Sequence, residues 1–227
     1  MREGDLIAWL SENFLYVMLG AATVFGAAWL ILLRKRLNMH PLMAILLAVL
    51  HTVLGVLSVR VFAIMEGANA GAMSLFGAVF FMPVAYFLGA KLSKRPMAEV
   101  FDIFAVVMIF TLMLARCNCL HAGCCLGRHM FHMDMRWPTR EAEIVFYLVF
   151  LALIIPRVWK GTTKGRVYPL YMAAYGAFRA IVECFRESSS ETLLHLSHVW
   201  AFLALALGVS IYIELNNRTK KKSRKRM

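Results

Sequence analysis

The side chains most suited to catalysis or ligand binding lie near residue 180, where polar and charged residues interrupt an apolar stretch. They recur at intervals of seven, four, four and three residues, at Tyr168, Tyr175, Arg179, Glu183 and Arg186. These intervals place them on one face of a helix. Because an unpaired charge in apolar surroundings is costly, Arg179 and Glu183 are expected to neutralise each other or to share a charged ligand. A structural ion pair is one interpretation, and a stripe that faces a polar cavity is the one we favour.

A second reactive group lies within residues 116–128, where four of the five cysteines fall within nine residues. Thiols beside histidines suggest a metal site, but the Cys-x-Cys and Cys-Cys spacings differ from the Cys-x2–4-Cys pairs of zinc sites. A thiol-redox role is a second interpretation, in which one of the last two cysteines bridges to one of the first two. Gly123 and Gly127 indicate tight turns at a helix end, so we favour a shaped loop with packed or paired cysteines.

A third polar segment, residues 136–143, leads into the next apolar stretch. Pro138 and Thr139 are helix-start signals, and Glu141 complements the positive end of a helix dipole. Capping explains Glu141 but explains Glu143 less well, so Glu143 is a candidate for chemistry.

Apolar helices must position these residues. Of the 227 residues 61% are hydrophobic and 17% are charged, and the mean hydropathy of +0.67 excludes a disordered chain and disfavours a soluble domain. A bilayer span needs about 20 apolar residues. Seven such stretches are predicted as transmembrane helices, at residues 14–33, 42–65, 73–90, 100–115, 143–158, 167–185 and 193–215. The fold class is therefore an all-α integral membrane protein, with one membrane domain over residues 1–215 and a basic tail over residues 216–227.

The distribution of basic residues predicts the orientation. If the N-terminus lies outside, the cytoplasmic segments hold 17 of the 25 lysines and arginines, including every lysine. Such an excess marks cytoplasmic loops, so we expect the N-terminus outside and the C-terminus in the cytoplasm. The net charge of +12 then reflects topology and contact with anionic lipid, and we expect no nucleic-acid partner.

The eight basic residues that this topology does not need are all arginines: Arg2, Arg60, Arg116, Arg128, Arg136, Arg140, Arg179 and Arg186. Arginine suits bidentate recognition of phosphate or carboxylate. A phospholipid headgroup is the obvious phosphate at membrane depth. The alternative is that these arginines extend to the membrane interface without a ligand.

Taken in order, these segments resemble the prolipoprotein diacylglyceryl transferase family. The family's Arg-x-Gly-Asn-x-x-Asn-Gly-Glu-x-x-Gly pattern lies over residues 116–127 and keeps Arg116, Gly123 and Gly127. Its His-Pro-x-Gln-x-x-Glu pattern keeps Pro138 and Glu143. The Tyr-Gly-x-x-Arg-x-x-x-Glu-x-x-Arg pattern is kept whole, by Tyr175, Gly176, Arg179, Glu183 and Arg186. Weaker matches are Tyr16, Gly55, Arg60 and Asp102.

Several family positions are changed in this chain. Phe76 stands where the family has the histidine of a His-Gly-Gly segment, and Trp137 replaces the histidine before the motif proline. Cys119 and Cys124 replace the asparagine and glutamate of the first pattern. The arginines are thus kept while part of the polar and acid–base equipment is replaced, which suggests a divergent paralogue.

The resemblance implies a multi-pass protein of the bacterial cytoplasmic membrane that moves the diacylglyceryl group of phosphatidylglycerol to the cysteine of a prolipoprotein signal peptide. It implies catalytic roles for Arg116, Arg179, Glu183 and Glu143. It implies lipid binding by Arg60, Arg186, Tyr175, Tyr16, Gly123 and Gly127. Cys119 and Cys124 could have a thiol role, and His121 could substitute for the lost histidine. We expect no cofactor and no metal.

Three alternatives stay open. The first is a paralogue that acts on another phospholipid or acceptor, with Cys119 or Cys124 taking part. The second is a non-enzymatic metal-binding or thiol-redox membrane protein that uses the cysteine segment. The third is a transporter, which is disfavoured because no inverted repeat and no pair of interrupted spans is visible.

Overall fold

A computed structural model describes residues 9–69, 72–130, 134–187 and 195–224. These residues form long helices and no strand beyond two isolated β-bridges. The helices are, in chain order, α2 (Phe14–Leu32), α3 (Pro41–Met65), α4 (Phe76–Leu92), α5 (Met97–His121), α6 (Thr139–Trp159), α7 (Val167–Glu183) and α8 (Leu196–Arg224). Each lies over one of the seven predicted apolar stretches.

Five of these helices, α2, α3, α5, α6 and α8, are long and apolar enough to cross a membrane. Helices α4 and α7 have 17 residues each, which is shorter than an untilted span needs. The chain is therefore an α-helical integral membrane protein. The two largest differences from the predicted boundaries are at C-terminal ends: α5 continues six residues past the predicted end at residue 115, to His121, and α8 continues into the basic tail as far as Arg224.

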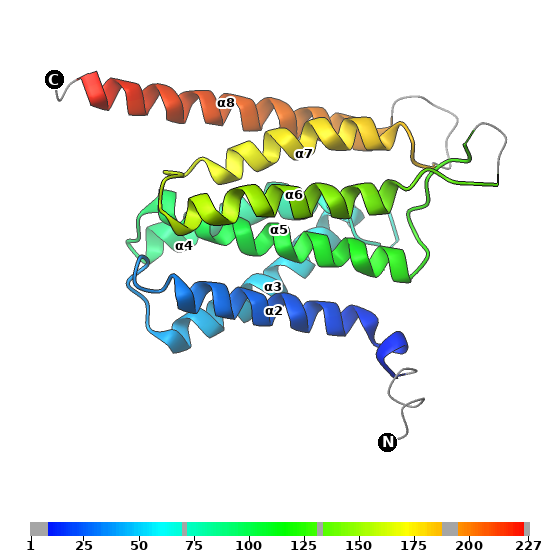
Figure 1. The fold of residues 1–227 in the computed structure, drawn as a ribbon, viewed down its shortest axis with the longest axis horizontal. Coiled ribbons are helices and arrows are strands. Elements are labelled where there is room, and N and C mark those ends of the chain that lie inside the picture. The colour runs from blue at the N-terminus through cyan, green and yellow to red at the C-terminus, as the bar shows by residue number, and fades with distance from the viewer. Residues whose placement is uncertain (1–8, 70–71, 131–133, 188–194, 225–227) are drawn as a thin grey trace.

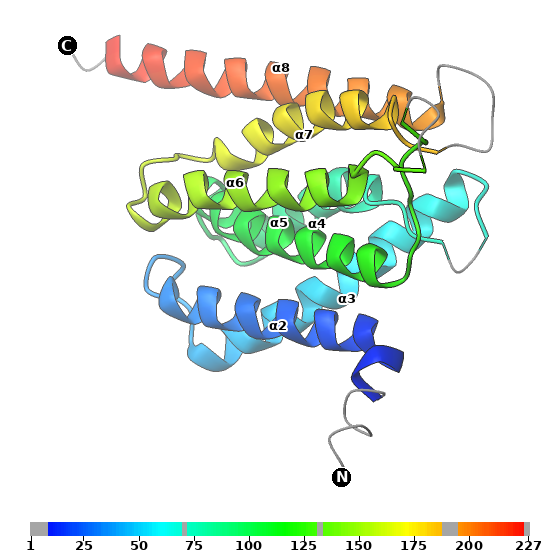
Figure 2. The ribbon, with the colours of Figure 1, turned by 45° about the vertical axis from the view of Figure 1, so that its right-hand side comes forward.

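Helix α5 lies at the centre of the bundle and contacts α2, α4, α6 and α7. In its most apolar stretch 61% of the residues are buried, against 22% in α2 and in α8. Both views place α2 and α3 on one side of α5 and α6, with α7 and α8 packed together on the other (Figures 1 and 2). The central helix can therefore carry a polar side chain that neighbouring helices must satisfy.

The connections divide between two ends of the bundle. Loops α2–α3, α4–α5 and α6–α7 gather at the end where α8 finishes, and α3, α5 and α7 finish at the opposite end (Figure 1). At the first end Asp102 accepts hydrogen bonds from the backbone N–H groups of Gly165 and Val167, at 2.6 and 3.0 Å. This carboxylate thus satisfies donors at the start of α7. The opposite end receives the last turns of α5 and α7.

Gly176 sets how closely α7 and α8 approach. A Cβ atom built at this position would lie 2.5 Å from both the Ala201 carbonyl oxygen and the Leu205 nitrogen. Because backbone atoms cannot move aside as a flexible side chain can, Gly176→Ala is expected to lower the free energy of unfolding by about 1–3 kcal/mol. Thermal unfolding in detergent measures this loss. Gly20→Ala is the matched control, since nothing lies within 4 Å of the added atom, and an equal loss in both variants would contradict the close packing.

Candidate active site

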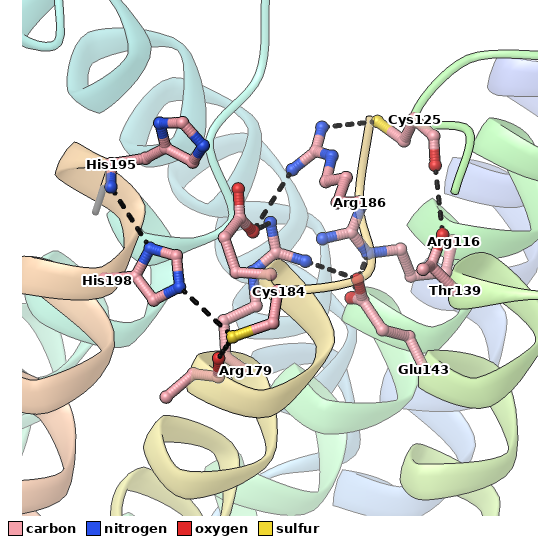
Figure 3. A network of polar contacts seen from close by, with 11 residues as sticks. Arg116, Cys125, Thr139, Glu143, Arg179, Cys184, Arg186, His195 and His198 are labelled. Carbon is pink, nitrogen blue, oxygen red and sulfur yellow. Dashed lines mark hydrogen bonds and ion pairs between the residues drawn. The ribbon is translucent and has the colours of Figure 1, made fainter. Parts of the chain in front are cut away.

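Glu143 joins two arginines from different helices. Its Oε2 lies 2.5 Å from Nε of Arg116 on α5, and its Oε1 accepts a hydrogen bond of 2.5 Å from Nη1 of Arg179 on α7. Glu143 itself is on the first turns of α6, and Figure 3 shows its carboxylate between the two guanidinium groups. All three side chains are 3–6% exposed. Three helices therefore meet at one buried carboxylate.

The network continues along α7 towards the surface. Arg179 Nη2 lies 2.6 Å from Glu183 Oε2, which confirms the pair expected from the spacing of four residues. Arg186 Nη1 lies 3.8 Å from the same oxygen, and the Arg186 side chain is 26% exposed. Every member of this group is paired, and all but Arg186 are buried. The group is therefore an ion-pair network rather than the wall of an open cavity.

The charges of this network do not cancel. It contains three guanidinium groups and two carboxylates, and with every group ionised it carries one excess positive charge. A buried charge without a partner is costly, while a charge-assisted contact to an anion is favourable. The charge balance therefore favours one further anion at Arg186, the member of the network whose side chain is 26% exposed.

Two loop segments pair beside Arg186, the exposed end of the network. The segment after α5 pairs with the segment after α7, through an isolated bridge between Gly127 and Arg186 and a 2.9 Å hydrogen bond from the Glu187 N–H to the Leu126 carbonyl. A Cβ atom at Gly127 would lie 2.1 Å from the Trp137 carbonyl oxygen. Glycine is therefore required here for close packing, and Gly123 serves instead at a turn, with φ +67°.

Three tyrosines lie beneath the network. The rings of Tyr147, Tyr171 and Tyr175 are fully buried and lie with centroids 5.6–6.5 Å apart. Their hydroxyl oxygens have no hydrogen-bond partner among the described residues. Tyr175, which we expected to bind lipid, is thus in the core below Glu143. Tyr147 was missed, although its position one turn after Glu143 could have signalled it.

Two other predicted lipid-binding residues lie apart from the network. Tyr16 and Arg60 line a largely apolar cavity of about 190 Å³ between α2, α3, α4 and α5. Gly55 also lines this cavity, as does Ala115, which directly precedes Arg116. His121 lies elsewhere, stacked on Phe14 with ring centroids 4.3 Å apart and in contact with Ser11, so it does not take the place of the changed histidine beside the arginines.

The cysteines of the α5–α6 segment are all unpaired. Cys125, which was not among the predicted site residues, accepts a 3.0 Å hydrogen bond from Nη2 of Arg186 at its Sγ (Figure 3). A hydrogen bond from Cys119 and the nearby positive charge of Arg186 lower the pKa of the Cys125 thiol, although its burial opposes them. Partial desolvation and the nearby Cys125 thiol raise the pKa of the Cys124 thiol. The two adjacent thiols therefore differ in how readily they ionise.

The helices and the buried charge network define a polytopic α-helical membrane protein with an internal polar site. The model of the family described as prolipoprotein diacylglyceryl transferase matches residues 15–214, and this chain belongs to that family. Membership agrees with the residues that the network brings together, since all five charged side chains lie at positions that the three family patterns keep.

Curated relatives agree with this assignment. The chain is 22% identical over 175 residues to a phosphatidylglycerol–prolipoprotein diacylglyceryl transferase of Dehalococcoides mccartyi, a match that covers 70% of this chain and 66% of the relative. It is 22% identical over 157 residues to the enzyme of that name from Clostridium tetani, covering 61% of this chain and 62% of the relative. The chain thus aligns with a little under two thirds of the length of these relatives.

Proposed function

We propose that this protein transfers the diacylglyceryl group of phosphatidylglycerol to the cysteine thiol of a prolipoprotein. The activity is the one named for its curated relatives. The observation that carries the proposal for this chain is the one excess positive charge of the five-residue network, whose partly exposed member is Arg186.

The charge of the network suits this reaction. A phosphodiester carries one negative charge, and the phosphate that leaves acquires a second as its bond to the glyceryl carbon breaks. Positive groups that are already fixed in place stabilise this developing charge more than the ground state, which lowers the barrier. Arg116 and Arg179 are assigned this role as fixed positive charges behind the partly exposed Arg186, which contacts the phosphate first. Glu143 holds the first two guanidinium groups in position.

At the glyceryl carbon the reaction makes one bond and breaks one bond, and one proton leaves the thiol. The substrate sulfur bonds to the terminal glyceryl carbon, the bond from that carbon to the phosphate oxygen breaks, and glycerol phosphate leaves with the electron pair. The thiol must first lose its proton, because the thiolate is the nucleophile. Glu183 is assigned as the acceptor of this proton, since it lies between the sealed Arg179 and the partly exposed Arg186.

The cavity beside α5 suits the apolar part of the lipid. Its lining is mainly aliphatic and includes Leu112 and Ala115, one turn and one residue before Arg116. An acyl chain placed there would bring its glyceryl end towards the arginine network. Arg60 and Tyr16 at this cavity then contact the lipid rather than the reacting atoms.

The membrane arrangement is also a proposal. Seven spans, including the short α4 and α7, put the basic loops and the end of α8 in the cytoplasm and the arginine network in the outer half of the bacterial cytoplasmic membrane. The clustering of the basic connections at one end of the bundle supports this orientation (Figure 1). Residues 1–215 then form the membrane domain, and the basic residues of 216–227 contact anionic headgroups.

A paralogue with a different phospholipid or acceptor is the second candidate. It is favoured by the cysteines at two family motif positions and by Trp137, whose ring packs against Phe185 with centroids 4.6 Å apart where the family has a histidine. Such changes alter groups next to the network without altering its charge.

One assay tests both candidates. Purified protein is reconstituted in vesicles of phosphatidylglycerol, phosphatidylethanolamine or cardiolipin together with a lipobox peptide. The mass of the peptide is then measured by mass spectrometry. We expect one diacylglyceryl group to be added in phosphatidylglycerol vesicles and none to a peptide with serine in place of cysteine. Transfer from another lipid alone would favour the second candidate. No transfer from any lipid would contradict the first candidate and the form of the second that keeps a prolipoprotein acceptor.

A further inference from the structure

Three cysteine sulfurs gather at the end of α5, outside the arginine network. The Sγ atoms of Cys119, Cys124 and Cys125 all lie within 4.8 Å of one another. Cys119 is on the last turn of the helix, and the other two are in the loop that follows. Cys124 is exposed and the other two are partly buried, so the group can be reached from outside the bundle.

The backbone at the helix end creates this cluster. Hydrogen bonds run from the Gly123 N–H to the Leu120 carbonyl at 3.4 Å and from the Cys124 N–H to the Cys119 carbonyl at 3.2 Å. This pair of bonds, with Gly123 at φ +67°, is the Schellman motif that ends many helices. It folds the chain back so that Cys124 returns to Cys119. Cys125 then takes φ +59°, which is costly for a residue other than glycine.

The spacing and the sulfur geometry suit a metal ion. Zinc binds thiolate sulfur at about 2.3 Å in tetrahedral geometry, so two sulfur ligands lie about 3.8 Å apart. Sulfurs within 4.8 Å reach that separation by small side-chain rotations. Cys119 and Cys124 are also separated by four residues, which is within the range of zinc-binding cysteine pairs. The shorter Cys-x-Cys and Cys-Cys spacings concealed this pair in the sequence.

The surroundings supply positive charge and a hydrogen bond to a ligand sulfur. Arg186 Nη2 donates to Cys125 Sγ at 3.0 Å, and Arg140 Nη1 donates to the Cys124 carbonyl at 3.5 Å. Guanidinium groups favour the deprotonated sulfurs that a metal requires, and such outer contacts orient ligands. Sulfur ligands select zinc or cuprous copper over calcium and magnesium, which prefer oxygen.

We propose that Cys119, Cys124 and Cys125 bind one thiophilic metal ion, of which Zn²⁺ is the representative, with the fourth position open to water or an external thiol. Three sulfurs from the protein and one open position are the arrangement that a tetrahedral ion with an exchangeable ligand requires. The proposal replaces our expectation of no metal, and it does not depend on the transfer reaction.

Metal content provides the test. Reduced, detergent-purified protein is equilibrated with Zn²⁺ under inert gas and freed of excess metal. Its zinc content per chain is then measured by inductively coupled plasma mass spectrometry. We expect one ion per chain, and at least a tenfold loss of affinity in Cys119→Ser and Cys125→Ser. Cys184→Ser is the matched control, because its sulfur lies beside His198 and outside the cluster, and it should retain the ion. No bound zinc in the wild-type protein, or equal zinc binding in all variants, would overturn the proposal.

A second measurement needs no variant and so does not depend on whether a variant folds. Wild-type protein is treated with iodoacetamide with and without Zn²⁺, and the modified peptides are identified. Zinc is expected to protect Cys124 and Cys125 while leaving the exposed Cys184 equally reactive. Equal modification of Cys124 and Cys184 in both conditions would contradict the site. Protein isolated with a disulfide in the cluster, which binds no zinc once that disulfide is reduced, would also contradict it.

Discussion

Arg179→Lys is expected to reduce diacylglyceryl transfer by about 100-fold or more while the helix bundle stays folded. Arg179 contacts Glu143 through Nη1 and Glu183 through Nη2, at 2.5 and 2.6 Å. A lysine keeps the charge but offers one ammonium group in place of the planar fork. It therefore cannot hold both carboxylates and still orient a phosphate. The measurement is the initial rate of transfer in phosphatidylglycerol vesicles.

Arg218→Lys is the matched control for this variant. Arg218 also forms a pair with a glutamate four residues away, at 2.7 Å from Glu214, but its side chain is 72% exposed. Its replacement is expected to leave the transfer rate unchanged. Equal rates in Arg179→Lys, Arg218→Lys and the wild-type protein would exclude Arg179 from the reaction.

Glu143→Gln is expected to lower the free energy of unfolding by about 3 kcal/mol or more and to abolish transfer. The change keeps the size and shape of the side chain but removes the only negative charge that Arg116 contacts among the described residues. Arg116 is then left with an uncompensated charge at 6% exposure. Because one partner is removed rather than both, the loss should be large.

Glu141→Gln is the control. Glu141 lies on the same helix, but its side chain is 44% exposed and its contact with Arg140 is long, at 3.7 Å. Surface changes of this kind usually alter stability by less than about 0.5 kcal/mol. Unfolding in detergent, monitored by circular dichroism, measures both variants. If the two lose the same stability, Glu143 does not hold the network together.

The positions of the helices could be predicted from the sequence, because apolar stretches in a membrane protein have few other ways to satisfy their backbone. Their ends could not. The apolar pattern stops before Arg116, yet α5 continues to His121 because its backbone hydrogen bonds persist until Gly123 ends the helix. Likewise, α8 continues to Arg224, through basic residues that the sequence predicted to form a separate tail.

The candidate site was predictable within a helix but not between helices. The spacing of Arg179 and Glu183 predicted their pair, which lies on one face of α7. The contact of Glu143 with Arg116 and Arg179 depends on how α5, α6 and α7 pack, and a helical period does not specify that. We favoured a polar cavity at the stripe, and the helices instead pack the charges against each other.

A structure of the protein in phosphatidylglycerol nanodiscs would show whether the arginine network binds the lipid phosphate. We expect one ordered lipid with its phosphate within hydrogen-bond distance of Arg179 or Arg186, and with an acyl chain in the cavity lined by Arg60. A phosphate ordered at the opposite end of the bundle, with Arg116 and Arg179 still held only by Glu143 and Glu183, would contradict this expectation.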